Sequence, residues 1–130
     1  MPISFEKIKR GSEYSRHELA ELWGYSSFHA IARCVVTPKN DNKIVLFVIK
    51  EKQATFEQYS DRITGSILEW EGPTDHFAEQ RILKADSAGD EIHLFYRERH
   101  HFDFIYQGNL KVIRYLLHTD KLSQFTFELS

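Results

Sequence analysis

The stretch Ile92-His93-Leu94-Phe95-Tyr96-Arg97 decides the fold class of this chain. Its side chains alternate, and large apolar or aromatic groups fall in both alternating sets, which is the pattern of a β-strand that packs on both faces. The segments that follow, residues 104–106, 110–118 and 125–129, are also rich in β-branched and aromatic residues. The last third of the chain is therefore predicted to be almost wholly extended.

The segments that precede this stretch add further strands. Residues 34–37 and 44–49 are predicted to form a hairpin around a turn at residues 38–42. Residues 67–71 have the same strand character and are closed by Gly72-Pro73, a pair that ends regular structure. The sheet is therefore predicted to draw strands from the whole length of the chain.

Helix signals lie between these strands. Ser15, followed three residues later by Glu18, is a capping box that opens a helix over residues 16–23, and Gly24 ends it. The other helical segments are predicted at residues 28–33 and 74–84, with a turn at residues 86–90. Six or seven short strands with two or three flanking helices indicate an α+β domain with a curled, barrel-like, mostly antiparallel sheet.

Length and composition exclude several classes of protein. The 130 residues are predicted to form a single domain, residues 1–130. The net charge is −2, but residues 1–50 carry more basic than acidic side chains. Any contact with nucleic acid therefore needs a local basic patch. The longest apolar run, residues 44–49, is too short for a membrane span, and the N-terminus has no secretory signal. The single cysteine, Cys34, excludes a disulfide framework, so we expect a reducing, cytoplasmic location.

Motifs for catalysis and metal binding are not found in the sequence. The seven histidines include no His-x-x-x-His pair, and the adjacent His100 and His101 would point to opposite faces of a strand. There is no phosphate-binding glycine loop and no nucleophile elbow. We therefore predict no enzyme activity, no metal and no cofactor. The alternative is a small metal-dependent nuclease or hydrolase that uses Asp61, Glu69 and Glu71 with a histidine.

Two features of the N-terminal half fit DNA binding. Residues 18–33 resemble a helix-turn-helix, with Ala20 four residues before a turn at Gly24 and polar residues at the start of a second helix. The same region also fits a loop that faces DNA phosphates. The predicted contacts to the DNA backbone are Ser26, Ser27, Arg33, Lys39, Lys43, Arg97 and Arg99.

The middle of the chain holds a candidate base pocket. Tyr59, Asp61, Trp70 and Glu71 bring two rings and two carboxylates together in a short segment. A cytosine flipped out of a duplex is held by stacking on rings and by an acceptor for its exocyclic amine, which these residue types supply. On the residues alone the alternative is more common: the two rings belong to the core and Asp61 caps a turn.

Five short motifs in a fixed order carry a resemblance to a known family. They are Glu13-Tyr14-Ser15-Arg16, Tyr59-x-Asp61, Trp70-x-Gly72, the stretch at residues 92–97, and Phe104-x-Tyr106-x-Gly108. Together they resemble the accessory domain at the C-terminus of modification-dependent restriction helicases, which also stands beside HNH nuclease modules in bacterial restriction proteins. That domain is similar to the SET-and-RING-associated (SRA) domain. The resemblance covers about residues 11–130.

The resemblance implies a curled SRA/PUA-like sheet and a recognition module of a type IV, modification-dependent restriction system. Such a module binds double-stranded DNA and flips a modified cytosine, 5-methylcytosine or 5-hydroxymethylcytosine, into a pocket. By the motif matches, Tyr59 and Trp70 would stack on the base and Asp61 would bind its amine, while the Phe-x-Tyr-x-Gly motif would be structural. The implied partners are modified duplex DNA and a nuclease or helicase module, in the same or another chain, in a bacterial cytoplasm.

Overall fold

The computed structural model describes residues 3–38, 41–51, 62–72, 78–99, 102–118 and 123–129. The strands are β1 (Glu13–Tyr14), β2 (Val35–Val36), β3 (Lys43–Glu51), β4 (Arg62–Thr64), β5 (Ile67–Glu71), β6 (Glu91–Arg99), β7 (Phe104–Leu116) and β8 (Gln124–Leu129). The helices are α1 (Arg16–Leu22), the 3₁₀ turn η1 (Phe28–Ile31), α2 (Glu79–Leu83) and α3 (Ala85–Ala88). In this part of the chain no helix is long and apolar enough to cross a membrane.

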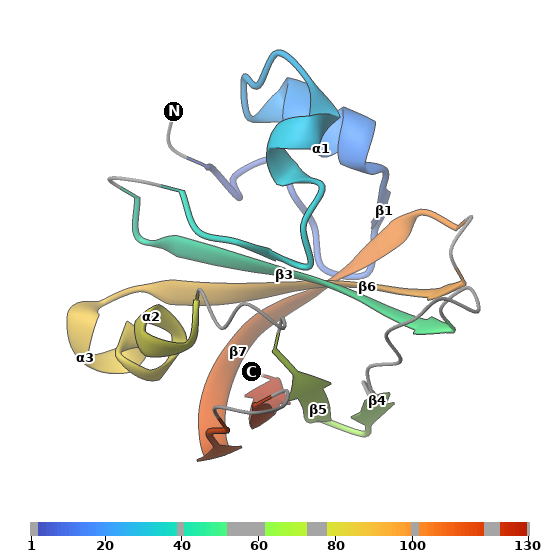
Figure 1. Cartoon of the computed structure of the whole chain (residues 1–130). Helices are drawn as coiled ribbons and strands as arrows, with labels where there is room; N and C mark the ends of the chain where they lie inside the picture. Colours follow the sequence, from blue (N-terminus) through green and yellow to red (C-terminus); the bar gives the residue numbers. More distant parts are fainter. Residues whose placement is uncertain are drawn as a thin grey trace.

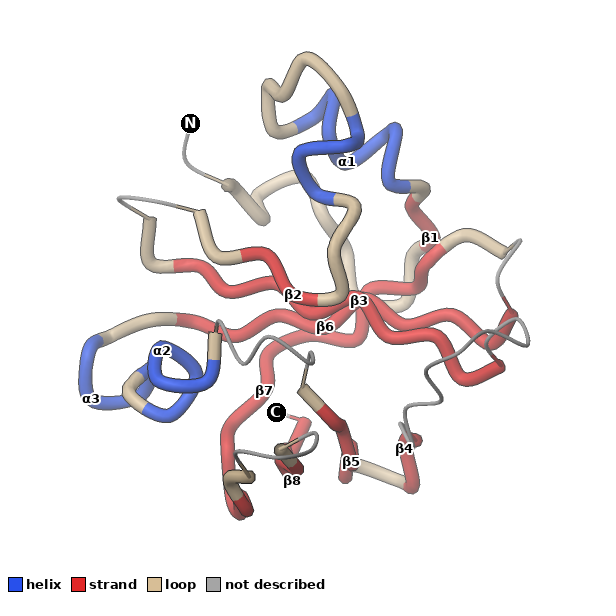
Figure 2. The backbone as a smooth tube through the Cα atoms, in the orientation of Figure 1, coloured by secondary structure: helices blue, strands red, loops and turns tan. Residues whose placement is uncertain are grey.

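The eight described strands form one sheet in the order β2-β3-β6-β7-β8-β5-β4, and β1 pairs with β7 outside this path. Only β3 and β6 are parallel among these pairs, and the other pairs are antiparallel. Figures 1 and 2 show β3 and β6 side by side across the middle of the molecule, with β4, β5 and β8 below them. The predicted α+β class and mostly antiparallel sheet are confirmed. The sheet curls but does not close, so the term barrel-like was too strong.

Both faces of the β3–β6 pair are buried, as the alternation in the sequence predicts. Along β3, Ile44 and Leu46 point into the core cluster that includes α2, α3, β5 and β8, which we call the lower core. Val45 and Phe47 point into a second cluster with the N-terminal segment, α1 and η1, which we call the upper core. Figure 1 shows α1 above the pair and β5 below it. The two parallel strands therefore form the middle layer between two cores.

The signals for the first helix and the first hairpin were correct. The Ser15 side chain accepts a hydrogen bond from the backbone N–H of Glu18, and the Glu18 carboxylate accepts one from the N–H of Ser15, so the capping box is formed. The helix ends before Gly24, which has φ +81°. Strand β2 pairs antiparallel with β3, as expected for the predicted hairpin. Local sequence chemistry is sufficient to specify these elements.

Two predictions in the C-terminal half were wrong in detail. The turn expected at residues 86–90 is the short helix α3, which Gly89 ends at φ +78°. The strands expected at residues 104–106 and 110–118 are one strand, β7. Its continuity depends on a bulge opposite β6, where the register shifts beside Gly108 at φ +102°. A bulge accommodates one extra residue without ending a strand, so the polar interruption at residues 107–109 was misleading.

Candidate nucleic-acid interface

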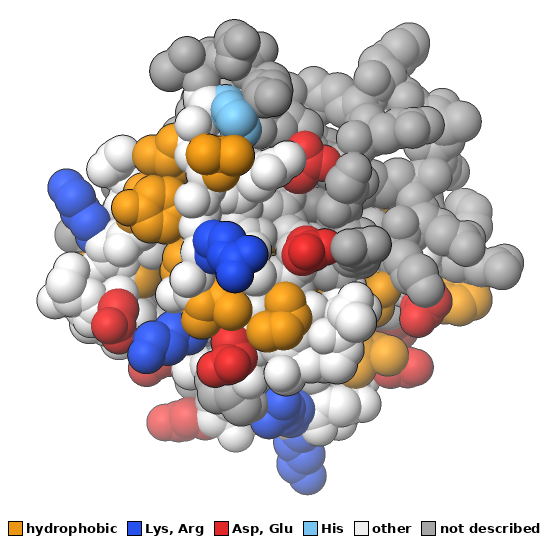
Figure 3. Space-filling model, turned by 90° about the horizontal axis from the view of Figure 1, so that it is seen from below, with side chains coloured by type: hydrophobic (Ala, Val, Ile, Leu, Met, Phe, Trp, Pro, Cys, Tyr) orange, Lys and Arg blue, Asp and Glu red, His pale blue; other side chains and the backbone are white. Residues whose placement is uncertain are grey.

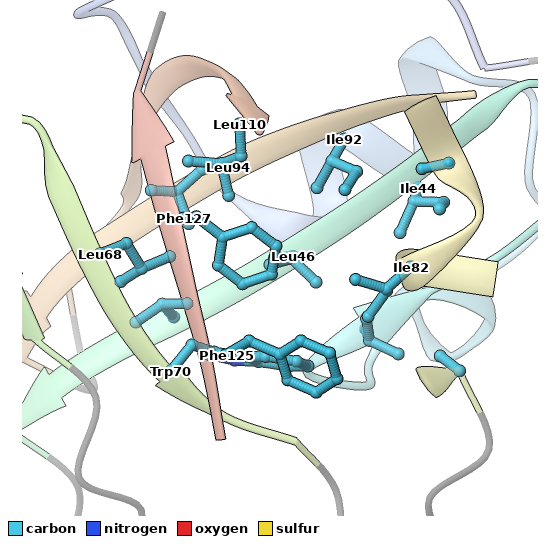
Figure 4. Close-up of a cluster of buried hydrophobic side chains, with 14 residues drawn as sticks. Ile44, Leu46, Leu68, Trp70, Ile82, Ile92, Leu94, Leu110, Phe125 and Phe127 are labelled. Carbon is cyan, nitrogen blue, oxygen red and sulfur yellow. The ribbon is translucent and has the colours of Figure 1, made fainter. Parts of the chain in front are cut away.

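The residues predicted for the base pocket do not all come together. Tyr59 and Asp61 lie outside the described residues. Trp70 is only 2% exposed, and its ring centroid lies 5.6 Å from that of Phe125 and 5.9 Å from that of Phe127 (Figure 4). The ring is enclosed by the lower core, so it presents no free face on which a base could stack. The structure places Trp70 as a core residue, which is the alternative that the sequence left open.

Glu71 lies on the opposite face of the sheet from Trp70. Burial along β5 alternates, so that Trp70 points into the core while Glu69 and Glu71 point outward. Residues 69–71 and residues 124–126 of β8 line a shallow hollow of about 240 Å³. Although both residues border this hollow, neighbouring residues of a strand face opposite sides, so the side chains of Trp70 and Glu71 point away from each other. The predicted pairing of this ring with this carboxylate is therefore wrong.

The helix-turn-helix prediction is also wrong. Helix α1 is followed by η1, a single 3₁₀ turn of four residues, and not by a second α-helix. A recognition helix must be long enough to lie in the major groove and present several side chains to the bases. Four residues of 3₁₀ helix rise about 8 Å, which is too short for that role. The chain then enters β2, so the N-terminal half supplies a loop and not a recognition helix.

The loop between α1 and η1 is exposed, so the phosphate-facing segment stays a prediction for these residues. Ser26 and Ser27 are both exposed. The Ser27 hydroxyl accepts a hydrogen bond from the N–H of His29 at 3.2 Å and lies 2.8 Å from the Nδ1 of that ring, so it caps η1. Arg33 is exposed at the rim of a shallow hollow that Tyr25 also lines. The loop therefore presents two serine side chains to solvent, and Arg33 is exposed beyond η1.

Lys43 is not a free surface charge. Its ammonium donates to the side-chain oxygen of Asn42 at 2.7 Å and lies 3.4 Å from the carboxylate of Glu91, and its side chain is 16% exposed. A phosphate would have to compete with these partners, so its predicted role as a backbone contact is weakened. Lys39 and the side chain of Arg99 lie outside the described residues.

Arg97 stacks on an aromatic ring at the end of the sheet where β6 leads into β7. Its guanidinium carbon lies 4.2 Å from the ring centroid of Phe104, and Nη1 donates to the backbone oxygen of Phe102 at 3.1 Å. Its Nε atom is buried and has no hydrogen-bond partner in the described part of the protein. Burial lowers the pKa of Arg97, while the charge of Asp103 opposes this shift. One N–H of a fixed cation therefore lacks an acceptor.

Arg16 packs against the same ring. Its guanidinium carbon lies 4.6 Å from the ring centroid of Phe47 and 4.9 Å from that of Phe104. It donates to the backbone oxygens of Ile31 at 3.2 Å and Arg33 at 3.4 Å. Burial, followed by the charge of Arg97, lowers the pKa of Arg16 to about 10. Two guanidinium groups thus share one aromatic ring, and their repulsion makes this end of the sheet receptive to an anion.

Arg16 belongs to the motif Glu13-Tyr14-Ser15-Arg16, for which no role of the arginine was predicted. One signal was available: Arg16 is the first residue of α1, where the positive end of the helix dipole disfavours a cation. A cation at such a position indicates that tertiary contacts outweigh the local cost. Here those contacts are two rings and two carbonyl oxygens, which join α1 and η1 to the sheet.

The Phe-x-Tyr-x-Gly motif is buried in the upper core, as a structural role requires. The Tyr106 hydroxyl lies 2.7 Å from Nδ1 of His93, whose Nε2 lies 2.9 Å from the Glu91 carboxylate. The ring of Phe5 stacks on His93 with a centroid distance of 3.6 Å. Burial raises the pKa of Tyr106 to about 12 and lowers that of His93, and the hydrogen bond from His93 lowers the pKa of Glu91. This network anchors the N-terminal segment.

Metal binding finds no support in the described residues, where no three His, Cys, Asp or Glu side chains are grouped closely enough to hold an ion. The described part of the candidate interface consists of the α1–η1 loop and of the arginine–aromatic cluster, defined as Arg16, Phe47, Arg97, Phe102 and Phe104. Its groups are exposed hydroxyls, two fixed cations and one ring, Phe102, that is 55% exposed.

Comparisons with known proteins agree with this architecture. No protein-family model and no curated protein sequence matches the chain. Among solved structures, the chain is similar to the SRA domain of SUVH5 in the crystal structure of its complex with hemimethylated CG DNA. The likeness has a TM-score of 0.67 and 13% sequence identity, and it covers 100% of this chain and 94% of that one. The chain therefore has an SRA-like fold.

Proposed function

We propose that this chain is a recognition module that binds duplex DNA and accepts a modified cytosine flipped out of the helix. The observation that carries the proposal is the likeness over the full length of the chain to an SRA domain solved on hemimethylated CG DNA. The likeness supplies the scaffold, but one fold can host unrelated functions. The function itself is argued from the site.

The arginine–aromatic cluster supports contact with the DNA backbone. The Nε atom of Arg97 is buried without an acceptor, and a buried N–H that lacks a partner costs about 1–3 kcal/mol. A phosphate oxygen that displaced the groups covering Nε would supply that acceptor, and its charge would offset the repulsion between Arg97 and Arg16. Phe102, the exposed ring of this cluster, is available for contact with a sugar or a base. We therefore place one end of the DNA at the turn between β6 and β7.

For the flipped base we retain Tyr59 as the stacking ring and Asp61 as the acceptor for the amine. Both residues belong to the segment that joins β3 to β4, and their motif is the one that the family resemblance assigns to the base. Trp70 is a residue of the lower core in this proposal and does not contact the base. Glu71 points outward from β5, so the acid of the pocket is Asp61 in this proposal.

The wider context completes the proposal. A pure recognition module needs a separate nuclease or helicase to act on the DNA that it finds, as in a type IV restriction system. The enzyme alternative predicts something different, which is cleavage of DNA by this chain alone in the presence of Mg²⁺ or Mn²⁺. Incubation with labelled duplex and either ion separates the two, because a recognition module leaves both strands intact.

The decisive experiment measures binding to matched duplexes by fluorescence polarisation. The duplexes differ at one central cytosine, which is plain, 5-methyl, 5-hydroxymethyl or glucosylated. We expect one modified duplex to bind at least about tenfold more tightly than the plain duplex, a difference of about 1.4 kcal/mol. Asp61→Asn is expected to remove this preference while binding to plain duplex is kept, because phosphate contacts provide the sequence-independent part of affinity.

Glu71→Gln is the matched control, since it removes a carboxylate that points outward from β5. It should keep the preference of the wild type. Equal binding to every duplex by the wild-type protein would refute recognition of modified cytosine. A loss of preference in Glu71→Gln but not in Asp61→Asn would refute the pocket assignment.

A further inference from the structure

The segment that leads into α1 lies along one edge of β7. The backbone N–H of Gly11 donates to the carbonyl oxygen of Tyr106 at 2.8 Å, and the N–H of Tyr106 donates to the oxygen of Ser12 at 3.1 Å. Strand β1 continues this pairing as far as Phe104. Figure 1 shows β1 beside the end of the sheet where β6 leads into β7. The backbone of this segment is therefore fixed to the strand that carries the Phe-x-Tyr-x-Gly motif.

Arg10 stands just before the paired stretch, and its guanidinium lies against Gly108. A Cβ atom at Gly108 would lie 3.2 Å from the Nε of Arg10, closer than ordinary van der Waals contact. Gly108 also has φ +102°, a left-handed conformation that favours glycine. The last residue of the motif therefore leaves room for a cation that any side chain would push aside.

The charge of Arg10 is available to a ligand. The side chain is exposed, and within the described residues its guanidinium forms no ion pair and no hydrogen bond. The exposed carboxylates of the same segment, Glu6 and Glu13, are likewise not paired with it. Because the neighbouring backbone is already fixed to β7, less conformational entropy is lost when Arg10 binds an anion than when a residue of a free loop does.

The motif has a cation at each of its two ends. Arg97 stacks on Phe104 at the first end, with 4.2 Å between its guanidinium carbon and the ring centroid, and Arg10 lies on Gly108 at the last. The four residue steps between Phe104 and Gly108 span about 13 Å of strand at 3.3 Å per residue. Each strand of a DNA duplex carries one phosphate for about every 3.4 Å of the helix axis, so a single duplex is long enough to meet both cations.

We infer that Arg10 is a further contact for the phosphate backbone of DNA, held in place by Gly108. The inference rests on the proposed function and deepens it, because it adds a second point of contact along β7 to the one at Arg97. Two points on one strand fix the direction of the duplex, which then lies along the edge of β7 that carries β1. The glycine of the motif thereby serves binding as well as the bulge.

The test measures affinity for a plain duplex by fluorescence polarisation at several salt concentrations. Arg10→Gln should lower the slope of log affinity against log salt by about one unit, since one phosphate contact is lost. Arg10→Lys keeps the charge and should keep the slope. Arg10→Gln combined with Arg97→Ala should lose about two units, because each cation meets its own phosphate. The urea midpoint of Arg10→Gln should match that of the wild type, as the side chain is exposed.

The matched control removes a basic side chain from another part of the molecule. Lys84 is exposed between α2 and α3, which lie on the other side of the sheet from α1 (Figure 1). On the face seen from below, Figure 3 shows basic and acidic side chains close together, so we expect no phosphate backbone to lie along that face. Lys84→Gln should therefore keep the slope of the wild type.

An unchanged slope in Arg10→Gln would overturn the inference, and a lowered urea midpoint at the same time would show that Arg10 only packs the bulge. An equal loss of slope in Lys84→Gln would also overturn it, since the effect would then come from net charge. Equal binding of plain and modified duplexes by the wild type refutes only the recognition of modified cytosine, because these slopes are measured on plain duplex. Absence of any binding by the wild type refutes both.

Discussion

The upper and lower cores both contain large buried rings, more of them in the upper core, but they stabilise the fold by different chemistry. The upper core combines rings with polar groups: Arg16 on Phe47 and Phe104, His93 beneath Phe5, and the indole N–H of Trp23 bonded to the backbone oxygen of Ser4. Such buried polar groups are costly when they lose a partner. The upper core should therefore respond to changes of hydrogen bonding and charge.

The lower core is almost entirely apolar. Trp70, Phe125 and Phe127 pack against aliphatic side chains of β3, β6 and α2 (Figure 4). It contributes to the free energy of unfolding through apolar burial and close packing, which depend on the volumes of the side chains. The two cores therefore have different roles: the polar upper core adjoins the arginine–aromatic cluster, whereas Trp70 packs the opposite side of the sheet.

The largest expected effect is from Trp70→Ala. The cavity left among Phe125 and Phe127 should cost about 3–5 kcal/mol in the free energy of unfolding, measured with urea. Trp70→Phe fills part of the space and should cost less. If Trp70→Ala keeps the stability of the wild type to within about 1 kcal/mol and only loses preference among duplexes, Trp70 is a base-stacking residue and its assignment to the core is wrong.

A smaller effect is expected from Arg16→Met, which keeps an unbranched apolar side chain and removes the guanidinium. The backbone oxygens of Ile31 and Arg33 lose their donors, and we expect a loss of about 1–3 kcal/mol in the same assay. Lys84→Met changes an exposed residue between α2 and α3, and its stability should stay within about 0.5 kcal/mol of that of the wild type. An Arg16→Met variant as stable as this control would contradict the polar character of the upper core.

The contrast also explains which features could be predicted from sequence. The capping box at Ser15 and Glu18, the alternation of residues 92–97 and the strand at residues 67–71 depend on neighbours in the chain, and all three were predicted correctly. The partner of each strand depends on distant residues. The parallel pairing of β3 with β6 and the bulge beside Gly108 were therefore not foreseen.

The candidate site was harder to predict than the fold for the same reason. Residue type suggested that the ring of Trp70 and the carboxylate of Glu71 share a pocket, but strand alternation separates them onto two faces. The shared ring of Arg16 and Arg97 joins residues far apart in the chain, so spacing in the sequence carried no sign of it. Lys43 was predicted to be a surface cation. Its ion pair with Glu91 joins two strands that are far apart in the sequence, so no local pattern indicated it.

The pH dependence of stability should come from the upper core and not from the apolar lower core. Burial lowers the pKa of His93 in the folded state below its ordinary value of 6.5, so the unfolded chain binds more protons once the pH falls below 6.5. Stability is therefore lost on acidification from about pH 6.5 down through the lowered pKa. The raised pKa of Tyr106 has the opposite consequence: stability falls as the pH rises from about 10 to 12.

Urea midpoints measured across both ranges check these slopes. His93→Gln should flatten the acidic slope and Tyr106→Phe the alkaline one, whatever each variant does to overall stability. His17→Gln, an exposed histidine on α1, is the control and should keep the acidic slope. Slopes in the two variants that match those of the wild type would show that neither group of the upper core governs the pH response.

The smallest effect on stability, and the one closest to function, is expected from Arg97→Ala. The guanidinium packs on one ring and donates to one backbone oxygen, so the change should cost about 1 kcal/mol or less. If Arg97 contacts a phosphate, the plot of log affinity against log salt should lose about one unit of slope for every duplex, modified or plain. Arg97→Lys keeps the charge and should retain that slope, although it cannot reproduce the stacked guanidinium. An unchanged slope in Arg97→Ala would show that Arg97 does not contact a phosphate. Of the two described parts of the candidate interface, only the α1–η1 loop would then remain.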